Sequence, residues 1–209
     1  MLGETALANE PQFRGWLAIE DATATWPDDR VAAVDALLAF ARNDRDALQT
    51  EAGMWIVRMA VRTGDRAAIE EGIAVFHDAA AMSTGAIRPI QREWIAAALD
   101  EPRRAAQRCE AVSAEFDALG RLLGAADALA DAAVHWDRAA AADGGVDPVA
   151  ADRARAAAEL ATTRYVDIGV VPPLGWPLGA SSGAMATAPL DDAPASDAGA
   201  ATDPARHSR

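Results

Sequence analysis

The residue types that most often carry catalysis or bind metal ions are scarce in this sequence. It contains one cysteine, Cys109, and three histidines, His77, His135 and His207. None of them has a second His or Cys at the short spacing of a metal-binding motif, so we predict no metal site. An aspartate follows His77 directly and His135 by two positions, but helical neighbours this close point to different faces and form no dyad. We therefore expect structural or surface roles for the histidines and no catalytic residue.

Patterns that bind nucleotides are also missing. The sequence has no lysine, which excludes a Walker A phosphate loop, and no G-x-G-x-x-G follows a predicted strand. Cys109 follows an arginine-rich run that could lower the pKa of a thiol, but no histidine stands beside it, and a free cysteine is usually buried as a small hydrophobic residue. Three adjacent acid pairs, best explained as solvated faces or charges near helix N-termini, are Glu20-Asp21, Asp28-Asp29 and Glu70-Glu71. We expect no cofactor.

The charge balance is strongly acidic. The chain has 32 acidic and 19 basic side chains, a net charge of -13 and a pI near 4.5. Nucleic-acid-binding proteins carry a concentrated basic face, and anionic membranes attract basic segments, so we predict direct binding to neither. The closest group of basic residues is Arg103, Arg104 and Arg108. We predict it as a candidate partner-binding spot for an acidic peptide or a carboxylate effector, since arginine binds carboxylates in a bidentate manner.

Location is predicted from three features. No window approaches 18 uninterrupted apolar residues, so no membrane span is expected. Residues 1–15 have neither the basic nor the apolar region of a secretory signal, and one cysteine cannot form an intramolecular disulfide. We expect a cytoplasmic protein.

Tryptophan marks a repeat of about forty residues. Trp16, Trp55 and Trp94 are each 39 positions apart, and Trp136 follows 42 positions later. The first three tryptophans are each followed, after 21 to 24 positions, by a phenylalanine: Phe40, Phe76 and Phe116. Between each Trp and its Phe lies a cluster of Gly or Pro with acidic residues, which is typical of a helix end followed by a new helix. Each unit is therefore predicted to be a helical hairpin, with these seven aromatic residues as the structural anchors of the core.

The element pattern predicts an all-α fold. Alanine is abundant, alternating strand-like runs are absent, and apolar residues recur at helical spacing, as in Val31, Val34, Leu37 and Leu38. Eight helices are expected, near residues 12–25, 30–42, 45–63, 66–81, 86–99, 102–119, 121–142 and 148–164. A hairpin of this length cannot bury its apolar stripe alone, so we predict a tetratricopeptide-like α-solenoid.

Two regions follow from this pattern. Residues 1–168 are predicted to form the helical-hairpin repeat domain. Residues 169–209 are rich in Pro, Ala and Gly and have no amphipathic period, so we predict a disordered tail. Its only aromatic residue, Trp176, is either part of a plain linker or a short docking element.

One stretch resembles a known family. A segment in the tetratricopeptide-like region of large actinobacterial LuxR-type transcriptional regulators is similar to Phe116-Asp117-Ala118-Leu119-Gly120 followed by Gly124-Ala125-Ala126-Asp127-Ala128. The resemblance also includes Trp94-Ile95-Ala96-Ala97-Ala98. In that family an ATPase module precedes the helical repeats and a helix-turn-helix domain follows them. Neither has a counterpart in this sequence, so the resemblance implies the sensor or interaction part of a regulator and carries over no ATP-binding or DNA-contacting residue.

Three functions are therefore considered. The first is a non-catalytic interaction module that presents a groove to a protein, peptide or small effector, with no direct contact to nucleic acid. The second is a fragment of a LuxR-type regulator whose DNA-binding part is missing or separately encoded. The third is an enzyme, which would need a buried and mutually hydrogen-bonded Asp-Arg-His cluster in one pocket. The first is our prediction; the sequence indicates no oligomeric state.

Overall fold

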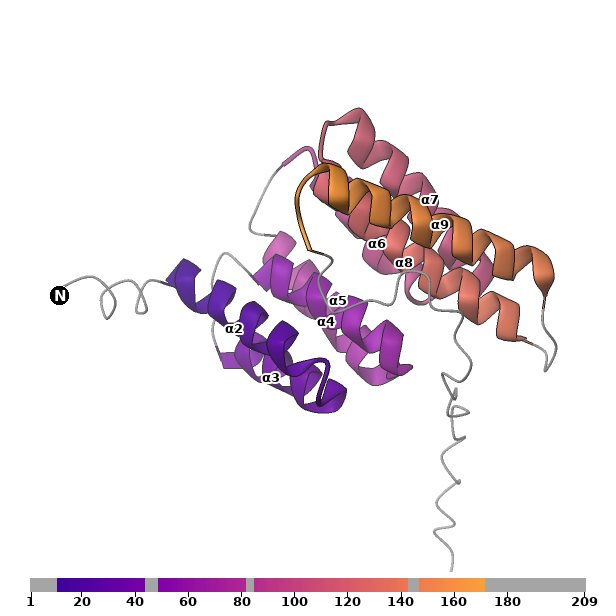
Figure 1. Ribbon diagram of the computed structural model, residues 1–209. Coiled ribbons are helices and arrows are strands. Elements are labelled where there is room, and N and C mark those ends of the chain that lie inside the picture. The colour runs from indigo at the N-terminus through magenta and orange to yellow at the C-terminus, as the bar shows by residue number, and fades with distance from the viewer. Residues whose placement is uncertain (1–10, 44–48, 82–84, 143–146, 172–209) are drawn as a thin grey trace, which may run out of the picture.

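The computed structural model describes residues 11–43, 49–81, 85–142 and 147–171, and these contain eight helices and no strand (Figure 1). The helices are α2 Pro11–Thr25, α3 Arg30–Asn43, α4 Gln49–Thr63, α5 Arg66–Ala80, α6 Arg88–Ala97, α7 Pro102–Ala118, α8 Leu122–Ala141 and α9 Pro148–Asp167. The all-α fold class is confirmed, and each expected helix is present. The predicted tail from residue 172 onward, with Trp176, lies outside the described residues, so the tail and the domain boundary stay predictions.

Several helices begin at an acidic residue that caps the N-terminus, and a glycine follows the end of α4. The Asp65 carboxylate accepts a hydrogen bond of 3.0 Å from the backbone N–H of Ala68 at the start of α5. Glu101 and Asp147 cap α7 and α9 in the same way, each followed by a proline in the first helical turn. Gly64, with φ of 79°, lets the chain reverse between α4 and α5, which a residue with a Cβ would do under strain.

Helices that follow one another in the sequence pack side by side. The most extensive contacts join α4 with α5, α7 with α8, and α8 with α9, followed by α2 with α3 and α6 with α7. In Figure 1 the α2–α5 half of the chain lies on one side and the α6–α9 half on the other. The α4/α5 contact is close because Gly53 and Gly72 face it: a Cβ on Gly53 would lie 2.8 Å from the Phe76 backbone nitrogen.

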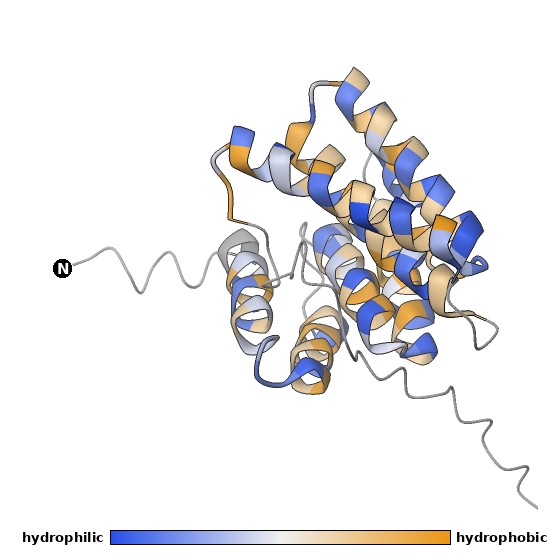
Figure 2. Cartoon of the chain, turned by 45° about the vertical axis from the view of Figure 1, so that its right-hand side comes forward, coloured by the Kyte–Doolittle hydropathy of each residue, from blue (hydrophilic) through white to orange (hydrophobic). Residues whose placement is uncertain are grey.

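The helices contain both hydrophobic and hydrophilic residues and are not uniformly apolar. Figure 2 shows hydrophobic and hydrophilic residues alternating along every coloured helix. Among the described helices, none has both the length and the apolar character needed to cross a membrane.

The aromatic repeat maps regularly onto the hairpins. Trp16, Trp55, Trp94 and Trp136 lie on α2, α4, α6 and α8, and Phe40, Phe76 and Phe116 lie on α3, α5 and α7. Four of these seven side chains are buried, namely Trp94, Trp136, Phe76 and Phe116, while Trp55 and Phe40 are half-buried. Trp94 and Phe116 meet edge to face with ring centroids 5.7 Å apart, which is the packing expected inside a hairpin.

Trp16 is not a core anchor, and this prediction was wrong. Its side chain is 53% exposed, whereas Trp26, in the turn after α2, is 3% exposed. The buried face of α2 continues through Ile19 and Ala22 to Trp26. At about 100° per residue Trp16 lies about 90° from the centre of that face. Among the described helices, α2 packs mainly against α3 and to a small extent against α4, so this first hairpin has less surface to bury a second indole.

Candidate functional site

A group of buried polar side chains joins four helices in the interior. We call it the Arg58 cluster. It consists of Arg58 and Arg62 on α4, Trp94 on α6, Asp127 and Asp131 on α8, and Tyr165 on α9. Buried charges are costly unless they are paired and hydrogen-bonded, so the arrangement of these groups decides what the cluster can do.

Asp131 is the centre of the cluster. Its Oδ2 accepts hydrogen bonds of 3.0 Å from Arg58 Nε and 3.0 Å from Trp94 Nε1. Its Oδ1 accepts a hydrogen bond of 2.6 Å from Arg62 Nη2. Both carboxylate oxygens are therefore hydrogen-bonded, Oδ1 to a donor on α4 and Oδ2 to donors on α4 and α6.

Asp127 lies one helical turn before Asp131 and completes the pairing of Arg58. Arg58 Nη2 donates to Asp127 Oδ1 at 2.9 Å, and the Tyr165 hydroxyl donates to the same oxygen at 2.5 Å. Arg62 Nη1 donates to the backbone oxygen of Arg58 at 2.6 Å. Two arginines thus balance two aspartates.

Aromatic rings enclose the Arg58 guanidinium. Its carbon lies 4.7 Å from the centroid of the Trp55 ring and 5.2 Å from that of Trp94. Cation–π attraction is stronger for a desolvated cation, so these rings stabilise the charge that burial would otherwise disfavour. The half-buried Trp55 therefore covers Arg58 and also packs against the hydrophobic core.

The pKa shifts of Asp131 and Arg58 favour their charged forms, whereas burial shifts the pKa values of Asp127 and Arg62 in the opposite direction. Burial raises the pKa of the Asp131 carboxyl, but Arg58 and Arg62 outweigh it, and the pKa ends below its ordinary value. Burial also lowers the pKa of Arg58, and here the two aspartates outweigh it, so that this pKa is raised. Asp127 has a raised pKa because burial dominates over its contact with Arg58. The phenol of Tyr165 has a raised pKa from burial and from Asp127, which keeps it a hydrogen-bond donor.

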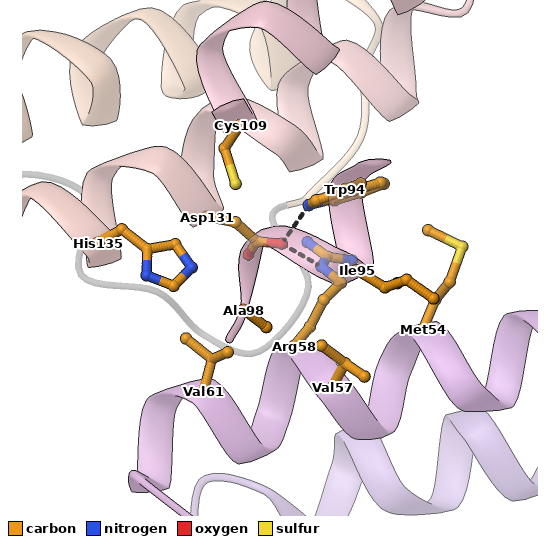
Figure 3. A pocket seen from close by; sticks show the side chains of 10 residues that line it. All are labelled: Met54, Val57, Arg58, Val61, Trp94, Ile95, Ala98, Cys109, Asp131 and His135. Carbon is orange, nitrogen blue, oxygen red and sulfur yellow. Dashed lines mark hydrogen bonds and ion pairs between the residues drawn. The ribbon is translucent and has the colours of Figure 1, made fainter. Parts of the chain in front are cut away.

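A small cavity adjoins the cluster (Figure 3). It is lined by Arg58, Trp94 and Asp131 together with His135, Cys109 and five apolar side chains. Its volume is about 10 Å³, room for one water-sized molecule. Substrate pockets are larger by more than an order of magnitude, typically about 300 to 1,000 Å³.

The two other titratable groups at this cavity are both kept neutral. His135 is 4% exposed and makes no hydrogen bond with a described residue, and burial lowers its pKa to about 4. Cys109 is 1% exposed, as expected for a packed thiol, and burial raises its pKa well above the ordinary value. A neutral imidazole that is not hydrogen-bonded to a described carboxylate, and a protonated thiol, are poorly prepared for acid–base or nucleophilic chemistry.

The enzyme hypothesis required a cluster of this kind, and the structure brings together most of it. Arg58, Asp131 and His135 surround one cavity, a grouping that the sequence analysis did not predict. His135, however, stands outside the hydrogen-bond network, and both aspartates are occupied by arginine, indole or phenol donors. What the arrangement can do is join helices: it links α4 to α8 across 73 residues of sequence.

The predicted basic spot is neutralised within the chain. Arg108 contacts Asp100 at 2.7 Å and Glu93 at 2.5 Å, and Arg103 pairs with Asp147. Arg104 lies 3.7 Å from Asp100. The three arginines are on α7 as expected, but each has an acidic partner. The spot is therefore not the concentration of unpaired positive charge that the sequence suggested.

One sequence signal could have revealed the cluster. Arg58 stands in the run Met54-Trp55-Ile56-Val57-Arg58-Met59-Ala60-Val61, and Asp127 and Asp131 stand among alanines and leucine on α8. Charged residues inside an apolar helix need buried partners of opposite charge, and a spacing of four places Asp127 and Asp131 on one face. The sequence alone did not indicate which arginine faces which aspartate.

Within the described ranges, no group of three or more His, Cys, Asp or Glu side chains is placed to hold a metal ion. Comparison with protein family models, with curated proteins and with solved structures finds no match for this chain.

Proposed function

We propose that this chain is a non-catalytic helical-repeat interaction module that binds a peptide segment of a partner protein or a small effector. The observation that supports this proposal is the closed state of the Arg58 cluster. Its charges satisfy one another, and the adjoining cavity of about 10 Å³ is too small for a substrate. The side chains that could most readily take part in chemistry therefore have a structural role. We propose that the partner binds to the outer surface of the hairpins.

Stacking of four hairpins into a tetratricopeptide-like solenoid is part of this proposal. It is supported by the side-by-side packing of consecutive helices and by the recurrence of Trp on the first helix and Phe on the second helix of successive hairpins. Stacked hairpins bind extended partners along their surface, because each unit contributes a similar set of exposed positions. A cytoplasmic location goes with it, since the one cysteine is a buried free thiol.

The test is selection of peptides by the purified full-length chain from a displayed random library. We expect enrichment of a common sequence motif, and the corresponding synthetic peptide should bind in isothermal titration calorimetry, whereas a peptide of the same composition in scrambled order should not. The helical circular dichroism signal must first show that the bait is folded. Absence of any enriched peptide that binds the folded chain would contradict the proposal of a peptide-binding module.

The second part of the proposal is that the module acts in a bacterial regulatory system. The alternative function is a fragment of a LuxR-type transcriptional regulator. Most of the residues that carry the resemblance lie on both sides of the α7–α8 turn, where Gly120 has φ of 67° and a Cβ on Gly124 would lie 3.1 Å from the Phe116 ring. The others, residues 94–98, lie at the end of α6. The resemblance therefore falls partly on positions that this turn requires. It supports a similar helix pair and, by extension, a role beside a separate DNA-binding protein.

Fluorescence anisotropy with a labelled DNA duplex separates the two parts. At physiological ionic strength, about 0.15 M, we expect no binding by this chain alone, because its net charge of -13 opposes the phosphate backbone. Salt-sensitive micromolar binding to arbitrary duplex DNA would instead favour the regulator fragment over the interaction module.

A further inference from the structure

A surface groove lies where the start of α3 meets the turn between α4 and α5. It is lined by Val31, Val34 and Asp35 from α3 and by Thr63, Gly64 and Asp65 from the turn. Its volume is about 200 Å³, against about 10 Å³ for the cavity at the Arg58 cluster. This is room for one large side chain rather than for a drug-sized molecule.

The groove combines an apolar wall with two carboxylates. Val34 is 3% exposed and forms a fixed surface, whereas Val31 is 65% exposed and stands at the rim. Gly64 has no side chain to fill the space. The Thr63 hydroxyl is directed back to the Ala60 backbone oxygen at 3.0 Å.

Neither carboxylate forms an ion pair with a described arginine, although the charge of Arg42 acts on Asp35 and Arg138 Nη2 would lie 3.9 Å from a Cβ on Gly64. Asp35 makes no hydrogen bond or ion pair with a described residue, and Asp65 uses Oδ1 to cap the N–H of Ala68. The arginines next in sequence have other partners: Arg66 binds Glu70 at 3.0 Å, and the Arg30 guanidinium lies 5.4 Å from the Trp26 ring.

Only some of the other acidic side chains of the surface differ in this respect, and Glu20 and Asp21 on α2 do not. Several are held by arginines, and these pairs include Arg42 with Glu71, Arg108 with Asp100, Arg153 with Glu110, and Arg164 with Asp117. At the groove, two carboxylates without an arginine partner stand beside exposed apolar surface, in a chain of net charge -13.

We propose that this groove binds an arginine side chain of a basic peptide segment in the partner protein. The aliphatic stem packs along Val31 and Val34, and the guanidinium reaches the carboxylates of Asp35 and Asp65, which satisfies both halves of an amphipathic side chain. This inference rests on the proposed function and names the partner chemistry. It reverses the sequence-based expectation of an acidic partner, because Arg103, Arg104 and Arg108 are paired within the chain.

The experiment uses two tripeptide probes and amide chemical shifts of the full-length chain. The probes are acetyl-Leu-Arg-Leu-amide and its citrulline twin, which has nearly the same shape but no charge. We expect the arginine probe to shift the amides of Val31, Asp35, Gly64 and Asp65 in a saturable manner, and the citrulline probe to bind about 10-fold more weakly, since a hydrogen bond to a charged group contributes about 1.5 kcal/mol.

A matched pair of variants tests the two carboxylates. The double variant Asp35→Asn/Asp65→Asn removes both charges while asparagine keeps the cap at position 65, so the fold is retained. The control, Glu20→Gln/Asp21→Asn, makes the same change in net charge on the exposed surface of α2. The first should weaken arginine-probe binding about 10-fold and the second should leave it unchanged.

The outcomes separate this inference from the proposed function. Equal binding of the two probes, shifts that map away from the groove, or an unaffected double variant would each overturn the arginine site. If library-selected peptides bind the double variant as well as the wild type, the interaction module stands and the groove is not its site. If no peptide is selected but the arginine probe binds the groove as expected, the groove recognises arginine and the peptide-binding function fails.

Discussion

Arg58 on α4 and Asp131 on α8 are joined by a hydrogen bond of 3.0 Å between Nε and Oδ2, although 73 residues separate them in the sequence. Both side chains are about 95% buried. This contact ties the α2–α5 half of the chain to the α6–α9 half at a point where neither hairpin is a sequence neighbour of the other. The predictions below test what this interior requires.

Asp131→Asn should destabilise the protein by about 3 to 5 kcal/mol. The substitution keeps the side-chain shape but leaves Arg58 and Arg62 with only one carboxylate between them, and breaking a buried ion pair from one side carries a cost of about this size. Urea unfolding followed by circular dichroism measures the change. The control is Asp152→Asn, which removes an exposed ion pair with Arg155 and should leave the unfolding midpoint unchanged. Similar midpoints for both variants would mean that the cluster does not join the two halves energetically.

The free energy of unfolding should fall by about 3 kcal/mol between pH 7 and pH 4 because of His135. Burial lowers its folded-state pKa from 6.5 to about 4, with Arg138 and Arg62 acting in the same direction and Asp131 against it. The unfolded chain therefore binds a proton as the pH falls through 6.5, while the folded chain stays neutral until about pH 4. The stabilising contribution of neutral His135 is complete above pH 6.5 and is lost as the pH falls towards 4.

The readout for His135 is the pH slope, not the absolute stability. His135→Gln and His135→Leu should both remove this part of the slope, whichever of them is the more stable at pH 7. Asp127, whose pKa burial raises, acts in the opposite direction, but it is present in wild type and variants and cancels in the comparison. A slope that is the same in all three proteins would show that His135 is not neutral in the folded state.

Gly53→Ala should destabilise the α4/α5 pair by about 1 to 3 kcal/mol, although alanine is the better helix former. The new Cβ would lie 2.8 Å from the Phe76 backbone nitrogen and 2.9 Å from the Gly72 oxygen, and backbone atoms cannot move aside as a flexible side chain can. Thermal unfolding measures the effect. Gly85→Ala is the control, since its Cβ would meet nothing within 4 Å. An unchanged midpoint for Gly53→Ala would show that α4 and α5 are not packed this closely.

The helices could be predicted from the sequence because their signals are local. Proline and glycine positions, capping acids and apolar periodicity each act within a few residues, so seven of the eight expected starts lie within two residues of those observed, and the start expected at 45 falls outside the described ranges. The Arg58 cluster could not be predicted in the same way. Which faces of α4, α8 and α9 meet is decided by packing across the chain, and no local pattern encodes that Arg58 faces Asp131.

The ion pairs of the predicted partner-binding arginines could not be predicted for a related reason. Arg103, Arg104 and Arg108 are close in sequence and do share α7, but their charge is cancelled by Glu93, Asp100 and Asp147 from outside that helix. Spacing alone shows where charges gather. It does not show which of them are already paired.

The repeated tryptophans lie on the first helices of successive hairpins but are not equally buried, and the last prediction measures the energetic consequence of this difference. Trp94→Ala should cost about 3 to 5 kcal/mol, because the ring is 6% exposed, packs on Phe116 and donates to Asp131. Trp16→Ala should cost below about 1 kcal/mol, because more than half of its side chain is exposed. Trp94→Phe separates the two roles of the indole: it keeps most of the packing and removes the N–H donor, so we expect a loss of about 1 to 2 kcal/mol. Denaturant unfolding of the three variants gives the ranking. Equal losses for Trp16→Ala and Trp94→Ala would restore Trp16 as a core anchor and contradict the exposed position of its ring.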